Sequence, residues 1–341
     1  MRCFLNLEDN YMVKCLRVFL VLLAVIVLAG GMAHEANAAP KHVIKVSYVN
    51  HPGEAVDLEV KYWAKLVNER SNGEVQLELF PSSQLGTQQE VYEQAILGAN
   101  VIGMGDPGNL SDYVPDFGIF SGPYLAEYDE KFKLFKSDWF KTMEKRLEEH
   151  GLVGMSYNWM YGPRNLVVTK PVLKPEDLKG LKIRVPNVKI QAEAFRAMGA
   201  TPTPMPLAEV YPALTQGVID GAENPMNVLY GQKLYEPAKN LIAIEYLNMT
   251  LCWMAGKAFL DTLPPEVVQM LKETCDEAGE YSKKLVPEED AKIASLMEAA
   301  GVKIHAIDKG LFREAAKSTY DNFPEWTPGL YDTVQRIIAD M

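Results

Sequence analysis

The chain has 341 residues, of which 48% are hydrophobic and 23% are charged, a composition that is ordinary for a soluble globular protein. This length is comfortable for two lobes and long for one compact core. The formal net charge of −11 argues against a nucleic-acid partner, because phosphate groups need a basic surface.

A targeting segment is predicted before the fold begins. Residues 16–28 form an apolar run that is broken only by Arg17, and residues 36–38 (Ala-Asn-Ala) offer a small-x-small cleavage site. This combination is typical of a secretory signal peptide, and the run is too short for a comfortable membrane span. We therefore expect residues 1–38 to be removed and the mature protein to be exported to the periplasm.

From residue 43 onward the sequence alternates between predicted strands and predicted helices. The predicted strands are residues 43–49, 75–80, 101–105, 152–159, 164–169, 181–185 and 241–244. The predicted helices are residues 56–71, 88–97, 132–151, 188–198 and 207–215. Helices of this length between strands are typical of parallel sheets with right-handed crossovers.

Residues 264–300 differ, because their helical pattern is nearly continuous. Its only breaker is Pro287, which we expect to kink the helix or to split it in two. At 1.5 Å per residue such a helix would be about 55 Å long, which is enough to extend across two lobes.

Two of the four cysteines lie in the leader, and Cys252 and Cys275 remain in a compartment that permits disulfides. Cys252 lies in a strand-like run and Cys275 in a helix-like one. Two buried free thiols are therefore favoured, and a disulfide is the alternative.

No catalytic or metal-binding motif is recognisable. The sequence lacks the GxSxG and HExxH patterns and has no pair of His or Cys at metal-ligand spacing. Residues 103–108 match GxGxxG, but no long helix follows them, so a turn is favoured over a dinucleotide site. We expect no catalytic residue, no cofactor and no metal.

Polar residues lie at the ends of several predicted strands. Asp106 follows one strand, Arg184 lies at the end of another, Arg164 opens a third, and Asn224 follows a predicted turn. In open α/β sheets the carboxyl ends of the strands face the ligand crevice. Two arginines with an asparagine favour recognition of a carboxylate, because guanidinium offers a bidentate fork, while structural salt bridges are the alternative.

Four segments carry a resemblance to a known family: residues 178–186 (LKGLKIRVP), 198–206 (MGATPTPMP), 209–211 (EVY) and 218–225 (VIDGAENP). They closely resemble the dicarboxylate-type substrate-binding proteins of TRAP (tripartite ATP-independent periplasmic) transporters. The similarity extends over nearly all of the mature chain, in the family's order and spacing.

The resemblance implies an α/β fold of two lobes, the type II-like or Venus-flytrap arrangement of periplasmic binding proteins, with a long helix across both lobes. We expect lobe I to comprise residues 39–161 plus 250–286, and lobe II residues 162–249 plus 287–341. The ligand would be enclosed between the two lobes.

The resemblance also implies roles for the strand-end residues. Arg184 would make a bidentate bond to the ligand carboxylate, Asn224 would hydrogen-bond the same group, and Arg164 would supply a second cation or brace the site. We expect three aromatic residues either to line the cleft or to pack in the core: Trp159, Tyr161 and Tyr211.

Four further positions bear on the ligand. Gln88, Asp106 and Val49 lie where related proteins have first-lobe contacts, and Leu207 lies where sialic-acid-binding members carry an aromatic residue. Val49 and Leu207 disfavour sialic acid. Asp106 would repel a second carboxylate and accept hydrogen bonds from hydroxyls, which favours a hydroxylated acid or sugar acid over a C4-dicarboxylate.

The resulting prediction is an exported, non-enzymatic and monomeric receptor. It would deliver a small organic acid to the sodium-coupled membrane permease subunits of a TRAP transporter. One alternative is an exported enzyme acting on such an acid, for which Asp106, Glu223 and His51 are the candidate groups. Another is the ligand-binding subunit of a sensory system.

Overall fold

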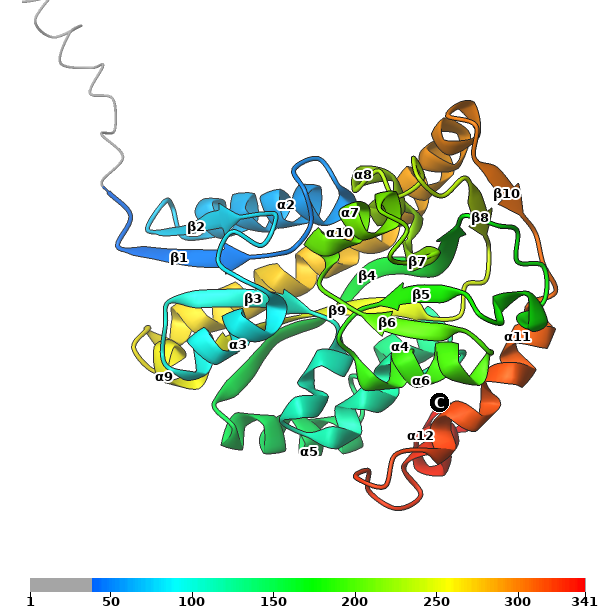
Figure 1. Ribbon diagram of the computed structural model, residues 1–341. Helices are drawn as coiled ribbons and strands as arrows, with labels where there is room; N and C mark the ends of the chain where they lie inside the picture. The colour runs from blue at the N-terminus through cyan, green and yellow to red at the C-terminus, as the bar shows by residue number, and fades with distance from the viewer. Residues whose placement is uncertain (1–38, 341) are drawn as a thin grey trace, which may run out of the picture. The chain divides into compact units, whose positions relative to one another are not determined.

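The computed structural model describes residues 39–340, so the predicted leader at residues 1–38 lies outside the described residues. From His42 onward the chain forms one unit around a ten-stranded mixed sheet (Figure 1). None of the helices described is long and apolar enough to cross a membrane.

The strands, in chain order, are β1 (His42–Ser47), β2 (Val75–Phe80), β3 (Val101–Gly105), β4 (Leu152–Val168), β5 (Lys182–Val185), β6 (Thr201–Pro204), β7 (Gly221–Pro225), β8 (Asn240–Ile242), β9 (Asn248–Gly256) and β10 (Lys303–His305). The α-helices are α2 (Ala55–Arg70), α3 (Gln88–Ile96), α4 (Tyr128–Leu134), α5 (Asp138–Glu149), α6 (Lys189–Ala197), α7 (Val210–Thr215), α8 (Met226–Gly231), α9 (Lys257–Leu260), α10 (Pro265–Ala299), α11 (Lys309–Ala316) and α12 (Leu330–Ala339). The 3-10 helices are η1 (Pro107–Asp112), η2 (Pro115–Ser121), η3 (Pro175–Leu178), η4 (Leu207–Glu209) and η5 (Lys317–Asp321).

The sheet has parallel flanks and an antiparallel centre. Its main path runs β2-β1-β3-β9-β4-β7-β5-β6, and β8 pairs with β4 and β10. β1 is parallel to β2 and β3, and β5 is parallel to β6 and β7. β9 is antiparallel to both β3 and β4, and β4 is antiparallel to β7 and β8. The expectation of purely parallel pairing is therefore wrong at the centre.

Strand β4 merges two predicted strands into one. It pairs with β9 along most of its length and with β7 over Arg164–Val168. Gly162 lies near the end of the stretch that pairs with β9, opposite Met249, and its φ of 121° is a conformation that side-chain-bearing residues rarely adopt. The register shifts near this glycine, so β4 continues past the bend that the sequence pattern suggested as a break.

Three other predicted elements differ in detail. The helix predicted over residues 132–151 is two helices, because the Ser137 hydroxyl caps α5 by accepting a hydrogen bond from Phe140 N at 3.1 Å. The proline tract at residues 201–204, which reads as an extended connector, pairs with β5 as β6. Pro287 does not split α10, which is one helix of 35 residues.

Helix α10 packs against α2 and β4, over a buried cluster of tryptophans. Trp63, Trp159 and Trp253 pack with ring centroids 5.0–6.1 Å apart. Trp159 donates a hydrogen bond through its indole Nε1 to the Cys275 carbonyl oxygen of α10 at 2.8 Å. Figure 1 shows α10 passing from the part of the sheet where α2 lies to the part where α8 lies. Cys252 and Cys275 are both free and buried.

The strand order brings the ends of β3, β5 and β7 to the candidate site. Asp106 follows the last residue of β3 and caps η1, Arg184 lies near the end of β5, and Asn224 lies near the end of β7. These are the positions at which open α/β sheets hold their ligands.

Candidate functional site

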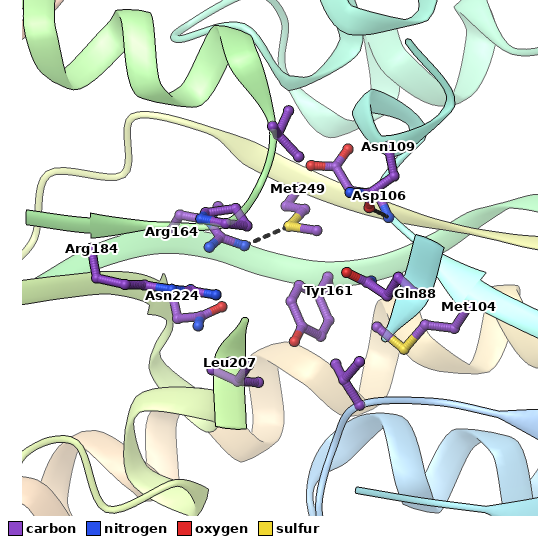
Figure 2. Close-up of a pocket in the computed structure, with 13 residues that line it drawn as sticks. Gln88, Met104, Asp106, Asn109, Tyr161, Arg164, Arg184, Leu207, Asn224 and Met249 are labelled. Atoms are coloured by element: carbon purple, nitrogen blue, oxygen red, sulfur yellow. Dashed lines mark hydrogen bonds between the residues drawn. The ribbon is translucent and has the colours of Figure 1, made fainter. Parts of the chain in front are cut away.

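A cavity lies where these strand ends meet, and it has an empty volume of about 370 Å³. The residues that line it are Val49, Gln88, Met104, Asp106, Asn109, Tyr161, Arg164, Arg184, Pro186, Val188, Leu207, Asn224 and Met249. Figure 2 shows Arg184 and Asn224 on one side, with Gln88, Asp106 and Asn109 on the opposite side.

Arg184 is a buried cation that has no carboxylate partner among residues 39–340. Its guanidinium donates from Nε and from an Nη atom to the Met205 carbonyl oxygen, at 3.0 and 2.7 Å. The side chain is buried at 3% exposure, and burial lowers the pKa of the guanidinium to about 10, with the positive charge of Arg164 acting in the same direction and Glu223 opposing. The group therefore stays charged at neutral pH and retains N–H donors for an anion.

Arg164 is already neutralised. Its guanidinium forms a bidentate ion pair with the Glu223 carboxylate, one bond of which is 2.7 Å long, and it also donates to the Glu223 carbonyl oxygen at 3.1 Å. Burial would lower the pKa of Arg164, but the Glu223 charge outweighs burial and raises it. Both side chains are fully buried, so the pair braces the cavity wall and adds no net charge to it.

Asn224 presents an amide to the cavity from β7, directly after Glu223. This side-chain amide makes no hydrogen bond within residues 39–340, and it faces the cavity from a residue that is otherwise buried. It can therefore hydrogen-bond a ligand oxygen beside Arg184.

The opposite side of the cavity carries a buried carboxylate, Asp106. Its Oδ1 accepts hydrogen bonds from the Gly108 N–H at 2.9 Å and from the Ser121 hydroxyl, and its Oδ2 accepts one from Gln191 Nε2 at 2.7 Å. Burial raises the pKa of Asp106, while those Ser121 and Gly108 bonds oppose the rise, as do the charges of Arg164 and Lys131.

Two amides accompany Asp106. Asn109 Oδ1 accepts a hydrogen bond from the Asp106 backbone N–H at 2.9 Å, which leaves its Nδ2 donors unused among the described residues. Gln88 lies in the first turn of α3 and also lines the cavity. This side therefore combines a hydrogen-bond acceptor with amide donors, which is the pairing that a hydroxyl group requires.

The remaining walls are apolar. Val49, Met104, Val188, Leu207 and Met249 line the space between the two polar sides. The sequence identified Val49 and Leu207 but none of the other three, because an apolar residue near a strand end has the same pattern whether it faces the core or a cavity.

Two predicted cleft residues lie elsewhere. Trp159 is fully buried in the tryptophan cluster under α10. Tyr211 is exposed on α7, where its hydroxyl donates to Glu236 at 2.7 Å. Of the three aromatic candidates, Tyr161 alone lines this cavity.

The structure also shows partners that sequence reasoning missed. Asn109 could have been noticed, because it follows the same strand end as Asp106. The sequence around Gln191 and Tyr246 does not indicate their roles, because each hydrogen-bonds a side chain that lies far away in the sequence. No cluster of His, Cys, Asp or Glu suited to a metal ion occurs in the part of the chain that the structure describes.

Comparison with known proteins decides the family. The family model for bacterial extracellular solute-binding proteins, family 7 (DctP), matches residues 46–325, which is well over half of the chain. The chain belongs to this family. The resemblance to TRAP solute-binding proteins and the two-lobed α/β fold are thereby confirmed.

Solved structures of TRAP periplasmic solute-binding proteins are similar over most of the chain. A TRAP periplasmic solute-binding protein from Ochrobacterium anthropi, with bound L-fuconate, is 46% identical with a TM-score of 0.86, covering 88% of this chain and 100% of the other. Another, from Actinobacillus succinogenes with bound L-galactonate, is 40% identical with a TM-score of 0.85 and the same coverage.

Among family 7 sequences, the 2,3-diketo-L-gulonate-binding periplasmic protein YiaO of Escherichia coli is 32% identical over 84% of this chain and 88% of its own length. This family consists of periplasmic solute-binding proteins, and the chain is therefore a solute receptor of the TRAP type.

Proposed function

We propose that this receptor binds a hydroxylated monocarboxylate of the sugar-acid class. The observation that carries the proposal is the distribution of charge in the cavity. One side holds a buried cation without a carboxylate partner, Arg184, and the opposite side holds a buried carboxylate, Asp106.

The two sides select different chemical groups. A ligand carboxylate at Arg184 would complete the guanidinium's hydrogen bonds and reach the Asn224 amide. A second carboxylate at the other side would face Asp106, and two like charges 4 Å apart cost about 4 kcal/mol at an effective dielectric constant of 20. A hydroxyl there would instead donate to Asp106 and accept from Asn109 or Gln88. The ligands named for the three relatives, L-fuconate, L-galactonate and 2,3-diketo-L-gulonate, are sugar acids and support this class.

The proposal is tested by isothermal titration of the exported protein with L-fuconate, L-galactonate and succinate. We expect tight binding of at least one sugar acid and much weaker binding of succinate. Tight succinate binding with no sugar-acid binding would contradict the proposed class.

Arg184→Met tests the carboxylate site directly. Removing one partner of a buried charge pair costs about 2–5 kcal/mol, which corresponds to a loss of affinity of at least tenfold. Arg196→Met is the matched control, because Arg196 is exposed on α6 and pairs with Glu193. If Arg184→Met weakens sugar-acid binding by less than tenfold, Arg184 does not hold the carboxylate.

We also propose that the protein is exported by its leader, delivers its ligand to TRAP permease subunits and performs no catalysis. The surroundings of the three candidate catalytic groups support the absence of catalysis. Asp106 and Glu223 are held by internal hydrogen bonds, and His51 does not line the cavity. Prolonged incubation with L-fuconate, followed by NMR, should return the acid unchanged, and any product would favour the enzyme alternative.

The lobe boundaries remain a proposal. The pairing of β4 with β9 up to Pro163 and with β7 from Arg164 onward supports a division close to residue 162. The C-terminal segment favours one revision. Phe323 and Trp326 pack in one hydrophobic cluster with Phe117 and Phe120 of lobe I, whereas η5 packs on α6 of lobe II, so we place residues 322–340 with lobe I.

A further inference from the structure

Asp106 has little hydrogen-bonding capacity left for a ligand. A carboxylate offers about four acceptor positions, and three donors already occupy this one: Gly108 and Ser121 at Oδ1, and Gln191 at Oδ2. The unoccupied position is on Oδ2, the oxygen that Gln191 holds. The direction of the unoccupied acceptor position on Oδ2 therefore depends on Gln191.

Gln191 reaches Asp106 from the other predicted lobe. It lies in the first turn of α6, the helix that follows the Arg184 strand, and it is fully buried. The helix start packs closely on η1, since a Cβ placed on Gly108 would lie 3.0 Å from the Val188 side chain. The sequence separation is large, yet the Nε2 to Oδ2 distance is 2.7 Å.

The orientation of the Gln191 amide is set by its partners. Its Nε2 must face the Asp106 carboxylate, because an amide oxygen would be repelled there. Its Oε1 lies 3.4 Å from the Tyr246 hydroxyl, whose single proton is donated to the nearer Glu223 carboxylate at 2.9 Å. Glu223 in turn holds Arg164. Gln191 is therefore held chiefly by its bond to Asp106 and packs beside the Tyr246–Glu223–Arg164 group of the opposite wall.

We propose that Gln191 is a positioning residue that determines specificity: by holding Oδ2 of Asp106, it directs the remaining acceptor position into the cavity and selects a ligand hydroxyl there. This inference rests on the proposed sugar-acid function. It assigns no direct ligand contact to Gln191, which does not line the cavity.

The test compares two acids that share a carboxylate and differ in hydroxyl groups. L-fuconate is titrated by calorimetry, and butyrate, which has no hydroxyl, by ligand-observed NMR. Gln191→Met keeps the length of the side chain and removes the donor. Without the Gln191 donor, the free acceptor position of Asp106 no longer points at the ligand, so the hydrogen bond between a ligand hydroxyl and this carboxylate is lost; such a bond is strong enough that L-fuconate binding should weaken about tenfold or more. Butyrate binding should weaken clearly less, because both acids share any loss that comes from the contact between the lobes, while only L-fuconate loses the hydroxyl contact.

A double-mutant cycle with Asp106→Asn separates positioning from packing. In the Asp106→Asn background, Gln191→Met should add almost no further loss of L-fuconate affinity. Gln191→Asn, which is too short to reach Oδ2, provides a second variant if Gln191→Met unfolds. Gln269→Met, on the exposed surface of α10, is the control for the substitution itself.

Three outcomes overturn the inference: equal losses for L-fuconate and butyrate, additive losses in the cycle, or unchanged L-fuconate affinity in both Gln191 variants. Failure of the proposed function is distinguishable, because the wild-type protein itself would then not bind the sugar acid, and the inference would fall with it.

Discussion

Glu59 is a buried carboxylic acid without a partner. It lies on α2 one turn before Trp63, is fully buried, and neither of its oxygens has a hydrogen-bond partner among the described residues. Burial raises the pKa of this carboxyl well above 4.5. The folded protein therefore keeps this carboxyl protonated to a higher pH than the unfolded chain does.

Glu59→Gln should consequently stabilise the protein at pH 7. The pKa of this carboxyl is higher in the folded protein than in the unfolded chain. Its contribution to the free energy of unfolding is therefore fully present below the unfolded pKa and is lost as the pH rises through the folded pKa. We expect Glu59→Gln to raise the free energy of unfolding at pH 7, because the neutral amide has no proton to lose when the chain unfolds. The gain should shrink as the pH approaches 4.5, measured by urea denaturation.

Glu78→Gln on the exposed face of β2 is the control, and it should change stability little at either pH. A destabilised Glu59→Gln variant would mean that the carboxyl makes a stabilising interaction that the structure does not show.

At the scale of elements, helix α10 continues through Pro287 without interruption. Proline in a helix interior removes one backbone hydrogen bond and clashes with the preceding turn. Pro287 is exposed, so its replacement removes no core packing.

Pro287→Ala should therefore raise the free energy of unfolding, by up to about 3 kcal/mol, as measured by thermal or urea denaturation. Pro265→Ala in the first turn of the same helix should be close to neutral, because the N–H that proline lacks has no helical partner at that position. Equal effects of the two substitutions would contradict this account.

At the scale of the whole molecule, several hydrogen bonds join the predicted lobes, and two of them pair a glutamine of lobe II with a carboxylate of lobe I. One is Gln191 with Asp106, and the other is Gln232 with Glu54, at 2.8 Å. Burial raises the pKa of Glu54 to about 7, which is opposed in part by hydrogen bonds from Asn50, His51 and Gln232. Separation of the lobes requires both contacts to break.

Ligand binding should therefore shift the population toward the state in which both contacts are made. We expect small-angle X-ray scattering to show a smaller radius of gyration with saturating L-fuconate than without ligand. Arg184→Met should lack this change at the same concentration, and Arg196→Met should keep it. Identical scattering curves with and without ligand in the wild-type protein would contradict closure of two lobes.

The helices and strands were largely predictable, because each depends on a local pattern. The alternation in residues 181–185 and Pro186 after it placed Arg184 at a strand end, and β2 and β3 have the predicted boundaries. The antiparallel pairing of β9 was not predictable in this way, since strand direction depends on the partner strand and not on the strand's own residues.

The same distinction holds for the site. Periodicity and turn residues placed Arg184 and Asp106 at predicted strand ends, whereas Asn224 was placed only after a turn, and its strand β7 appears only in the structure. Only the tertiary structure decided that Glu223 neutralises Arg164 and that Gln191 holds Asp106. The physical reason is that the charge and hydrogen-bonding capacity of a buried group depend on its neighbours in space, and the fold brings those neighbours from distant parts of the chain.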